Sequence, residues 1–377
     1  MQLFGQILTA ATLVCPAFVG LAEGQSSTEA QHSREYLYVG GEYVDTTAGH
    51  IFQNQMYVEK LSPADGSSRK YPVVFLHGGG QSGTNWLNKP DGGVGWASRF
   101  LEQGYEVYIV DETSRGRSPW WPDSGFAQGV FTAEFISERF TAVQDSDAWP
   151  QAKLHTQWPG TGKIGDPIFD NYYKSGVQYI KDTVEQETTM KAAGIALLEE
   201  IGPAVLITHS QGGLYGWTIT DARPSLVKAL VQIEPKGPPF QEAVFSTDFT
   251  RPWGLTTIPL GFEPTPTDPD QPLETMTIPS NSTDRVDCLV QAEPARQLPN
   301  LSGVPILIDT GEASYHAMYD HCFMLFLEQA GVLSAEHWNL GERGIHGNAH
   351  MQFMEENSDD IAAALDKWIR KSVGDTA

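Results

Sequence analysis

Residues 204–216 read AVLITHSQGGLYG, an apolar run that stops abruptly at Ser210 and continues into two glycines. Such a run of aliphatic and β-branched side chains predicts a buried strand. A strand that only filled a core would not need glycines crowded around a hydroxyl group. Because glycine lets the backbone pass close to its neighbours, the stretch predicts a sharp strand-to-helix turn that exposes the serine hydroxyl at one edge of a sheet.

Other apolar strands alternate with helical patterns along the chain. The predicted strands lie at 72–76, 106–110, 204–208, 229–233 and 304–312, and the helical patterns include 95–104 and 175–202. Nearly continuous apolar strands separated by helices indicate a parallel sheet covered on both faces. In such sheets the functional residues lie beyond the carboxyl ends of the strands.

Polar residues follow several of these strands. The sequence HGGG begins at His77, Glu234 directly follows the strand at 229–233, and the loop after the last strand contains His346 and His350. A serine, a glutamate and a histidine therefore occur in that chain order. All three are predicted to lie at one edge of the sheet.

Three motifs carry a resemblance to a known family. HGGG (77–80), DETSRGRS (111–118) and THSQGG (208–213) together resemble the α/β-hydrolase fold, over nearly the whole mature chain. The resemblance implies a mostly parallel central sheet covered by helices on both faces. Thr208 departs from the family's G-x-S-x-G pattern, where the first position is glycine. The region 77–118 is more similar to a subgroup of secreted bacterial and fungal esterases, in which the acid is a glutamate after the sixth strand.

The resemblance implies a role for each of five residues. Ser210 is the expected nucleophile, His350 the base and Glu234 the acid that orients the histidine. The backbone N–H groups of Gly79 and Gln211 are expected to form the oxyanion hole, with a contribution of roughly 3 kcal/mol per donor.

Alternatives remain for two of these roles. In most α/β-hydrolases the acid follows the seventh strand in a G-x-x-D pattern, but here that pattern ends in Ser314, so Asp309 and Glu312 are the alternative acids. His346 is the alternative base. The His-x-x-x-His spacing is interrupted by Gly347 and Asn348, which oppose a helix, and no metal or cofactor is expected. Asp111 is expected to brace the turn that carries Arg115, Gly116 and Arg117.

The N-terminus and the cysteines predict export. Residues 1–22 contain no charged side chain and are read as a signal peptide, which leaves 23–377 as the hydrolase domain. Cys288 and Cys322 then form an even pair, so a disulfide is expected, and Asn281 and Asn300 lie in N-glycosylation sequons. The net charge of −23 without a basic run excludes nucleic acid as a partner, and no second segment suits a membrane anchor.

Two insertions are expected to shape the substrate site. Residues 119–174 are rich in aromatic side chains and predict a cap, and the proline-rich residues 259–283 predict an extended surface excursion. The sequence thus predicts a secreted serine hydrolase that cleaves small-molecule carboxylic esters or lactones of an apolar or aromatic kind. An acyltransferase, a lyase or a non-catalytic binding protein could share the same residues, because the fold does not set the reaction.

Overall fold

A computed structural model describes residues 28–122, 124–268 and 270–375 of the chain, and the predicted signal peptide lies outside these residues. An eight-stranded sheet runs through the centre in the order β1-β4-β6-β5-β9-β10-β13-β14. The strands β6, β5, β9, β10, β13 and β14 are parallel to one another, and β4 pairs antiparallel with both β1 and β6. The bounds of these strands are β1 His32–Val39, β4 Met56–Pro63, β5 Val73–Leu76, β6 Val107–Asp111, β9 Ala204–His209, β10 Val227–Ile233, β13 Ile306–Thr310 and β14 Ala335–Asn339.

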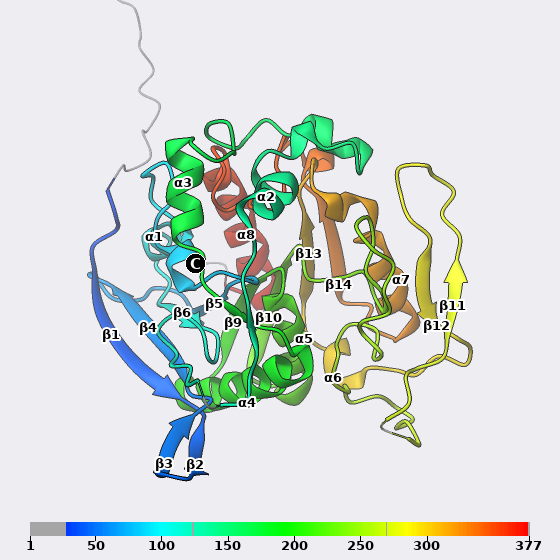
Figure 1. The fold of residues 1–377 in the computed structure, drawn as a ribbon, viewed down its shortest axis with the longest axis horizontal. Coiled ribbons are helices and arrows are strands. Elements are labelled where there is room, and N and C mark those ends of the chain that lie inside the picture. The colour runs from blue at the N-terminus through cyan, green and yellow to red at the C-terminus, as the bar shows by residue number, and fades with distance from the viewer. Residues whose placement is uncertain (1–27, 123, 269, 376–377) are drawn as a thin grey trace, which may run out of the picture.

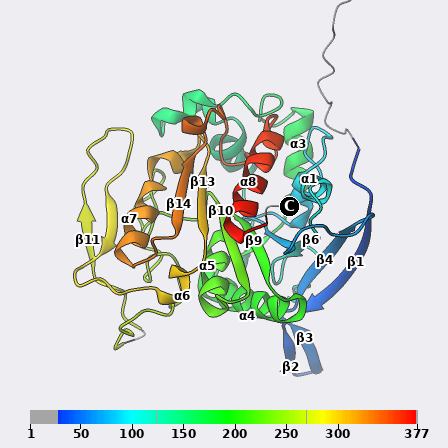
Figure 2. The ribbon, with the colours of Figure 1, turned by 180° about the vertical axis from the view of Figure 1, so that it is seen from behind.

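Helices cover both faces of the sheet, as the family resemblance implies (Figure 1). Alternate residues of a strand point to opposite faces, so in β9 the side chains of Val205 and Ile207 pack with α1 and α8, whereas Leu206 packs with α4, α5 and α7. Figure 2 shows α8 in front of the sheet, on the side opposite the view of Figure 1. The bounds of these helices are α1 Trp96–Glu102, α4 Thr183–Ile201, α5 Gly212–Ala222, α7 His321–Gln329 and α8 Ser358–Val373.

The helix predicted over 175–202 begins later than its apolar pattern suggested. Residues Tyr179–Ile180 form the short strand β8, which pairs with β7 (Gln128–Gly129), and α4 starts at Thr183. The Asp182 side chain accepts a hydrogen bond from the N–H of Glu185 and so caps the helix at this point. The prediction was therefore wrong over 175–182, where an N-cap signal marked the true boundary.

The predicted cap segment, 119–174, contains the helices α2 (Ala133–Ile136) and α3 (Pro167–Lys174) and several short helical turns. Both helices lie at the end of the molecule opposite α4, at the top of Figure 1. Trp149 and Trp158 of this segment are buried and pack in the interior. The aromatic side chains of the segment therefore divide between interior packing and the cavity described below.

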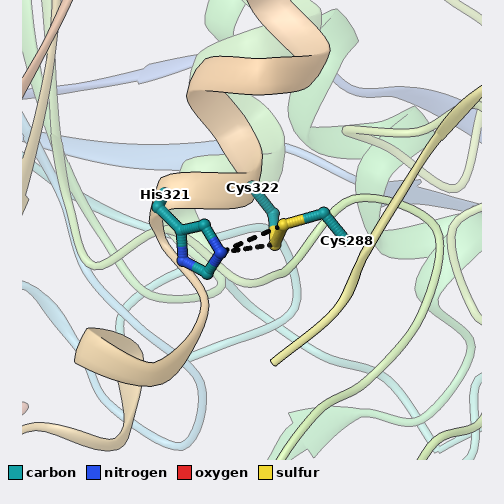
Figure 3. Close-up of side chains that lie close together, drawn as sticks. All are labelled: Cys288, His321 and Cys322. Atoms are coloured by element: carbon teal, nitrogen blue, oxygen red, sulfur yellow. Dashed lines mark hydrogen bonds between the residues drawn. A yellow bond between two sulfur atoms is a disulfide. The ribbon is translucent and has the colours of Figure 1, made fainter. Parts of the chain in front are cut away.

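The predicted disulfide between Cys288 and Cys322 is formed. It joins β12 (Cys288–Gln291) to the first turn of α7, and His321 Nε2 lies 3.2 Å from the Cys288 sulfur (Figure 3). In the described part of 259–283, the only regular element is β11 (Thr275–Ile278), which pairs with β12.

The remaining elements are small. The hairpin of β2 (Glu42–Thr46) and β3 (Gly49–Gln53) projects from the sheet beside β1, and α6 (Pro299–Ser302) precedes β13. Of the two sequon residues, Asn281 is exposed, whereas the side-chain amide of Asn300 donates a hydrogen bond to Asp221 at 3.2 Å. Every helix of the described ranges is too short or too polar to cross a membrane.

Candidate active site

The turn between β9 and α5 holds Ser210 in an unusual backbone conformation. Its φ of 52° lies in the left-handed region, which costs a non-glycine residue roughly 1–3 kcal/mol. Ser210 N donates to the carbonyl of Ile233 at 3.0 Å, and its own carbonyl accepts from Gly213 and Lys236 at 2.9 Å each. These bonds to β10 and to the loop after it maintain the sharp turn that the sequence predicted.

The two glycines after Ser210 allow the close approach expected of them. A Cβ on Gly212 would lie 2.6 Å from the backbone oxygen of His77, and a Cβ on Gly213 would lie 2.6 Å from Pro235. Thr208, which stands where the family has glycine, is accommodated because Gly216 leaves room for its methyl group. The Thr208 hydroxyl donates to the side chain of Gln232.

Glu234 and His350 meet directly at the carboxyl end of the sheet. His350 Nδ1 lies 2.6 Å from Glu234 Oε2, and both side chains are buried. Ser314 Oγ donates to the same oxygen and the N–H of Gly311 to Oε1, each at 2.7 Å. Since Nδ1 is bonded to the carboxylate, Nε2 is the imidazole nitrogen left free to exchange a proton with another group.

The residues considered as an alternative acid or base do not join the contact between Glu234 and His350. Glu312 accepts from His346 Nδ1 at 3.0 Å and from Gly347 N at 2.9 Å, so the two alternatives bind each other on the exposed side of the loop. The carboxylate of Asp309 has no hydrogen-bond partner among the described residues. Burial and the charge of Glu234 raise the pKa of Asp309 well above its usual value.

Asp111 braces the turn after β6 as expected. Its carboxylate accepts from Gly83 N at 2.7 Å and pairs with Arg117 Nε at 2.8 Å. These contacts fix the position of Arg117.

A second histidine, which the sequence reasoning missed, lies against this pair. His316 Nδ1 is 3.0 Å from Asp320, its Nε2 is 4.0 Å from Glu234, and its ring stacks on His350 with 5.0 Å between centroids. Burial alone would lower the pKa of His316, but the charges of Asp320 and Glu234 outweigh it and raise that pKa. The four-residue spacing of a histidine and an aspartate after β13 was the only signal in the sequence.

Burial favours the neutral imidazole of His350. Desolvation, followed by the charge of His316, lowers the pKa of His350 well below its usual value. Desolvation also raises the pKa of Glu234, although His316, Ser314 and Gly311 oppose this shift. A neutral histidine is the form that can accept a proton.

Ser210 opens onto a cavity of about 480 Å³. Aromatic side chains from the predicted cap line it, among them Phe131, Phe135 and Phe140. The His350 ring packs 4.7 Å from that of Phe140, just behind the cavity wall. Within the described residues, Ser210 Oγ makes no hydrogen bond with His350, an arrangement that is common in active sites without bound substrate.

The two residues expected to form the oxyanion hole line the same cavity. Gly79 and Gln211 both line it, and among the described residues neither N–H has an acceptor in the protein. A buried arginine ties their segments together. Arg115 donates to the Gly78 carbonyl at 3.2 Å and to the Gln211 side chain at 3.1 Å.

The ionic partner of Arg115 is the buried Glu112, at 2.9 Å. Burial raises the pKa of Glu112 to about 7 despite this contact, and burial with the charge of Arg115 lowers the pKa of His77 to about 3. Neither Glu112 nor the bridging role of Arg115 was expected from the sequence, where the only signal was their place after a buried strand.

His209 is a further contributor that the sequence analysis did not assign. Its Nε2 lies 3.0 Å from the backbone oxygen of His350 and therefore donates to it. Burial lowers the pKa of His209 well below its usual value, so the ring is neutral. His209, the residue before Ser210, thus holds the backbone of His350 in place.

Two groups of side chains within the described residues have the composition of a metal site. Glu234, His316 and His350 place ligand atoms within 4.8 Å of one another, but the Nδ1 atoms of both histidines are bonded to carboxylates. The second group is Cys288, His321 and Cys322. The sulfurs of its two cysteines are already joined to each other in the disulfide.

Comparison with known proteins agrees with this architecture. Residues 71–283 match the family model described as "alpha/beta hydrolase fold". The chain belongs to the α/β-hydrolase family. It is 44% identical over 371 residues to "Probable secreted lipase phiG" from Fungal sp. (strain ATCC 74256), covering 98% of this chain and 99% of the relative. The predicted export agrees with this similarity: the chain is a secreted, esterase-like α/β-hydrolase.

The fold is also similar to that of a solved protein titled "The Atomic Resolution Structure of a Novel Bacterial Esterase". The TM-score is 0.62 and the identity 19%, with 93% of this chain and 98% of that chain covered. At this identity the similarity concerns the fold, and it extends beyond the segment that matches the family model.

We expect Gly212→Ala to lower both the melting temperature and the hydrolase activity. The new methyl group would meet a backbone oxygen of the sheet, which cannot move aside as a flexible side chain can. Thermal unfolding and hydrolysis of a short ester measure the two effects. Gly303→Ala is the matched control, because a Cβ there meets nothing within 4 Å. Equal behaviour of the two variants would contradict the proposed close packing of the turn.

Proposed function

We propose that this protein is a secreted serine hydrolase that cleaves carboxylic esters through Ser210, His350 and Glu234. The observation that carries the proposal is the 2.6 Å contact between His350 Nδ1 and the buried Glu234 carboxylate. It fixes the imidazole tautomer and leaves Nε2 as the base. The strained turn that presents Ser210 in the adjoining cavity supplies the nucleophile.

In the proposed mechanism, Ser210 Oγ attacks the acyl carbon while His350 Nε2 takes the hydroxyl proton. The imidazolium then returns this proton to the departing alkoxide, which leaves as an alcohol and yields an acyl-enzyme. A water molecule, deprotonated by His350, attacks the acyl carbon in turn. The carboxylic acid is released and Ser210 regains its proton. Glu234 stabilises the imidazolium in both half-reactions.

The oxyanion of each tetrahedral intermediate is proposed to bind the N–H groups of Gly79 and Gln211. Their lack of an acceptor among the described residues supports this role. Preorganised donors of this kind cost no reorganisation during the reaction. The bonds from Arg115 to Gly78 and Gln211 support the proposal, since they hold the two amide-bearing segments in a fixed relation.

The cavity walls favour an apolar or aromatic substrate. Phe131, Phe135 and Phe140 come from the segment 119–174, for which we propose the role of a cap that excludes water. A lactone would react by the same steps as an open-chain ester, because both present an acyl carbon with an alkoxide leaving group.

We expect Ser210→Ala to abolish hydrolysis of short p-nitrophenyl esters while the melting temperature changes little. Removal of the nucleophile in a serine hydrolase lowers kcat by about 10⁶. Release of p-nitrophenol measures the rate. A folded variant that retains activity would disprove the assignment.

We expect Glu234→Gln to lower kcat by about 10³–10⁴, because a neutral amide neither stabilises the imidazolium nor holds the same tautomer. The matched controls are Asp309→Asn and Glu312→Gln, which remove the alternative carboxylates. Both controls should keep kcat within about tenfold of the native value. Full turnover by Glu234→Gln, or an equal loss in a control variant, would refute the choice of acid.

We expect kcat/KM to remain high as the pH falls below 6.5. His350 acts as a base only when neutral, and it is neutral above its pKa, which burial and the charge of His316 lower from 6.5. In His316→Gln that charge is lost, so the pKa of His350 rises and the acid limb of the profile moves to higher pH. The account would be contradicted if the acid limb of the native enzyme lay above pH 6.5, or if the acid limb of His316→Gln moved to lower pH.

A further inference from the structure

Arg139 is a cation in the Ser210 cavity that forms no ion pair with any of the described residues. It belongs to the cap segment, in the helical turn Ser137–Thr141, and lines the cavity together with Ser210. Its Nε is buried without a hydrogen-bond partner among the described residues, and none of the ion pairs found in those residues includes it. A buried donor that is left unpaired is unfavourable, so an acceptor is missing at this position.

Half-buried Arg139 differs from the two fully buried arginines of the described residues in its lack of an ion pair, although Arg115 Nε also has no hydrogen-bond partner. Arg115 and Arg251 are almost completely inaccessible, and each forms an ion pair with a glutamate, at 2.9 and 2.7 Å respectively. For Arg139 the largest effect on the pKa is desolvation, which lowers it. The charges of Glu138 and Glu242 act on it more weakly, but neither forms an ion pair with it in the described residues, and the guanidinium stays charged.

Two aromatic rings fix the position of this guanidinium. Its central carbon lies 4.0 Å from the ring centroid of Phe135 and 3.8 Å from that of Phe245, and both rings line the same cavity. Cation–π contacts engage the guanidinium without using its N–H groups, which point outward in the guanidinium plane. The rings therefore orient the donors and leave them available to a ligand.

The other charges around the cavity are also mainly positive. Lys181, Lys236 and His316 line it, and Glu242 is the one carboxylate among the described residues that line it. That carboxylate is already shared by Arg251, at 2.7 Å, and Lys236, at 3.8 Å. The net charge of the chain is −23, but at about 0.1 M salt charges beyond roughly 10 Å are largely screened, so the local cations decide which ligands enter.

We propose that Arg139 binds a carboxylate of the substrate, so that the preferred substrates are apolar or aromatic esters that also carry a free carboxylate group. This inference rests on the proposed ester hydrolysis and names its substrate class. A carboxylate matches the planar donor arrangement of a guanidinium and accepts two parallel hydrogen bonds from it. The surrounding rings would contact the apolar part of the same molecule.

The test compares pairs of esters that differ only in one charge. The first pair is monomethyl terephthalate and methyl 4-carbamoylbenzoate, with the charge on the acyl side. The second is 4-carboxyphenyl acetate and 4-carbamoylphenyl acetate, with the charge on the alcohol side. We expect the native enzyme to prefer the carboxylate ester in at least one pair. Arg139→Gln should lower kcat/KM for that ester about tenfold or more and change the carbamoyl ester less than about twofold.

Arg343→Gln is the matched control, because Arg343 also stacks on an aromatic ring, 3.8 Å from Trp338, but does not line the cavity. Arg343→Gln should hydrolyse the carboxylate ester and the carbamoyl ester with the same kcat/KM as the native enzyme. Equal losses on charged and neutral esters in Arg139→Gln would assign Arg139 a packing role and overturn the inference, as would a variant with native selectivity. If that variant does not fold, stronger inhibition of the native enzyme by benzoate than by benzamide supports the inference, and equal inhibition overturns it.

The two proposals fail in different ways. If the native enzyme cleaves the carbamoyl esters through Ser210 but shows no dependence on Arg139, only the inference on the substrate is lost. If it cleaves none of the four esters and no p-nitrophenyl ester, the proposed hydrolysis is lost as well.

Discussion

The carboxylate of Glu234 is the group on which the geometry of the site depends. A buried carboxylate is costly unless donors surround it, and here donors come from Gly311, Ser314 and His350. These residues lie between 77 and 116 positions away along the chain. The need to satisfy one charge therefore joins the end of β10, the loop after β13 and the last loop before α8. The position of the imidazole follows from this requirement.

Around that carboxylate, the buried ionisable groups Asp320, His316 and His350 are arranged so that opposite charges adjoin. Asp320 holds His316, and His316 lies between Asp320 and Glu234, where its charge favours the ionised carboxylate and the neutral form of His350. Arg139 interrupts this pattern, since its charge meets aromatic rings and open cavity. Because the two fully buried arginines of the described residues, Arg115 and Arg251, each form an ion pair, a half-buried arginine without one points to a group that binds something outside the chain.

Much of the fold could be predicted because its signals are local. An apolar run predicts a strand wherever it occurs, and crowded glycines after Ser210 predict a close turn. The start of α4 was misplaced because the amphipathic pattern extends back through a segment that pairs with β7, and only the cap at Asp182 marks the boundary. His316 and the bridging role of Arg115 were missed for a different reason. His316 approaches Glu234, and Arg115 donates to Gly78 and Gln211, all of which lie on other elements.

The sequence by itself determined the order of strands and helices, the kind of turn at Ser210 and the presence of a serine, a glutamate and a histidine after successive strands. It left Asp309 and Glu312 open as alternative acids. Local sequence rules place a residue near the end of a strand, but they do not say which of several such carboxylates approaches the histidine. Only the tertiary structure brought Glu234 to His350 and placed Arg139 in the cavity with its Nε lacking a hydrogen-bond partner among the described residues. Local propensities act over a few residues, whereas these contacts depend on how distant elements pack together.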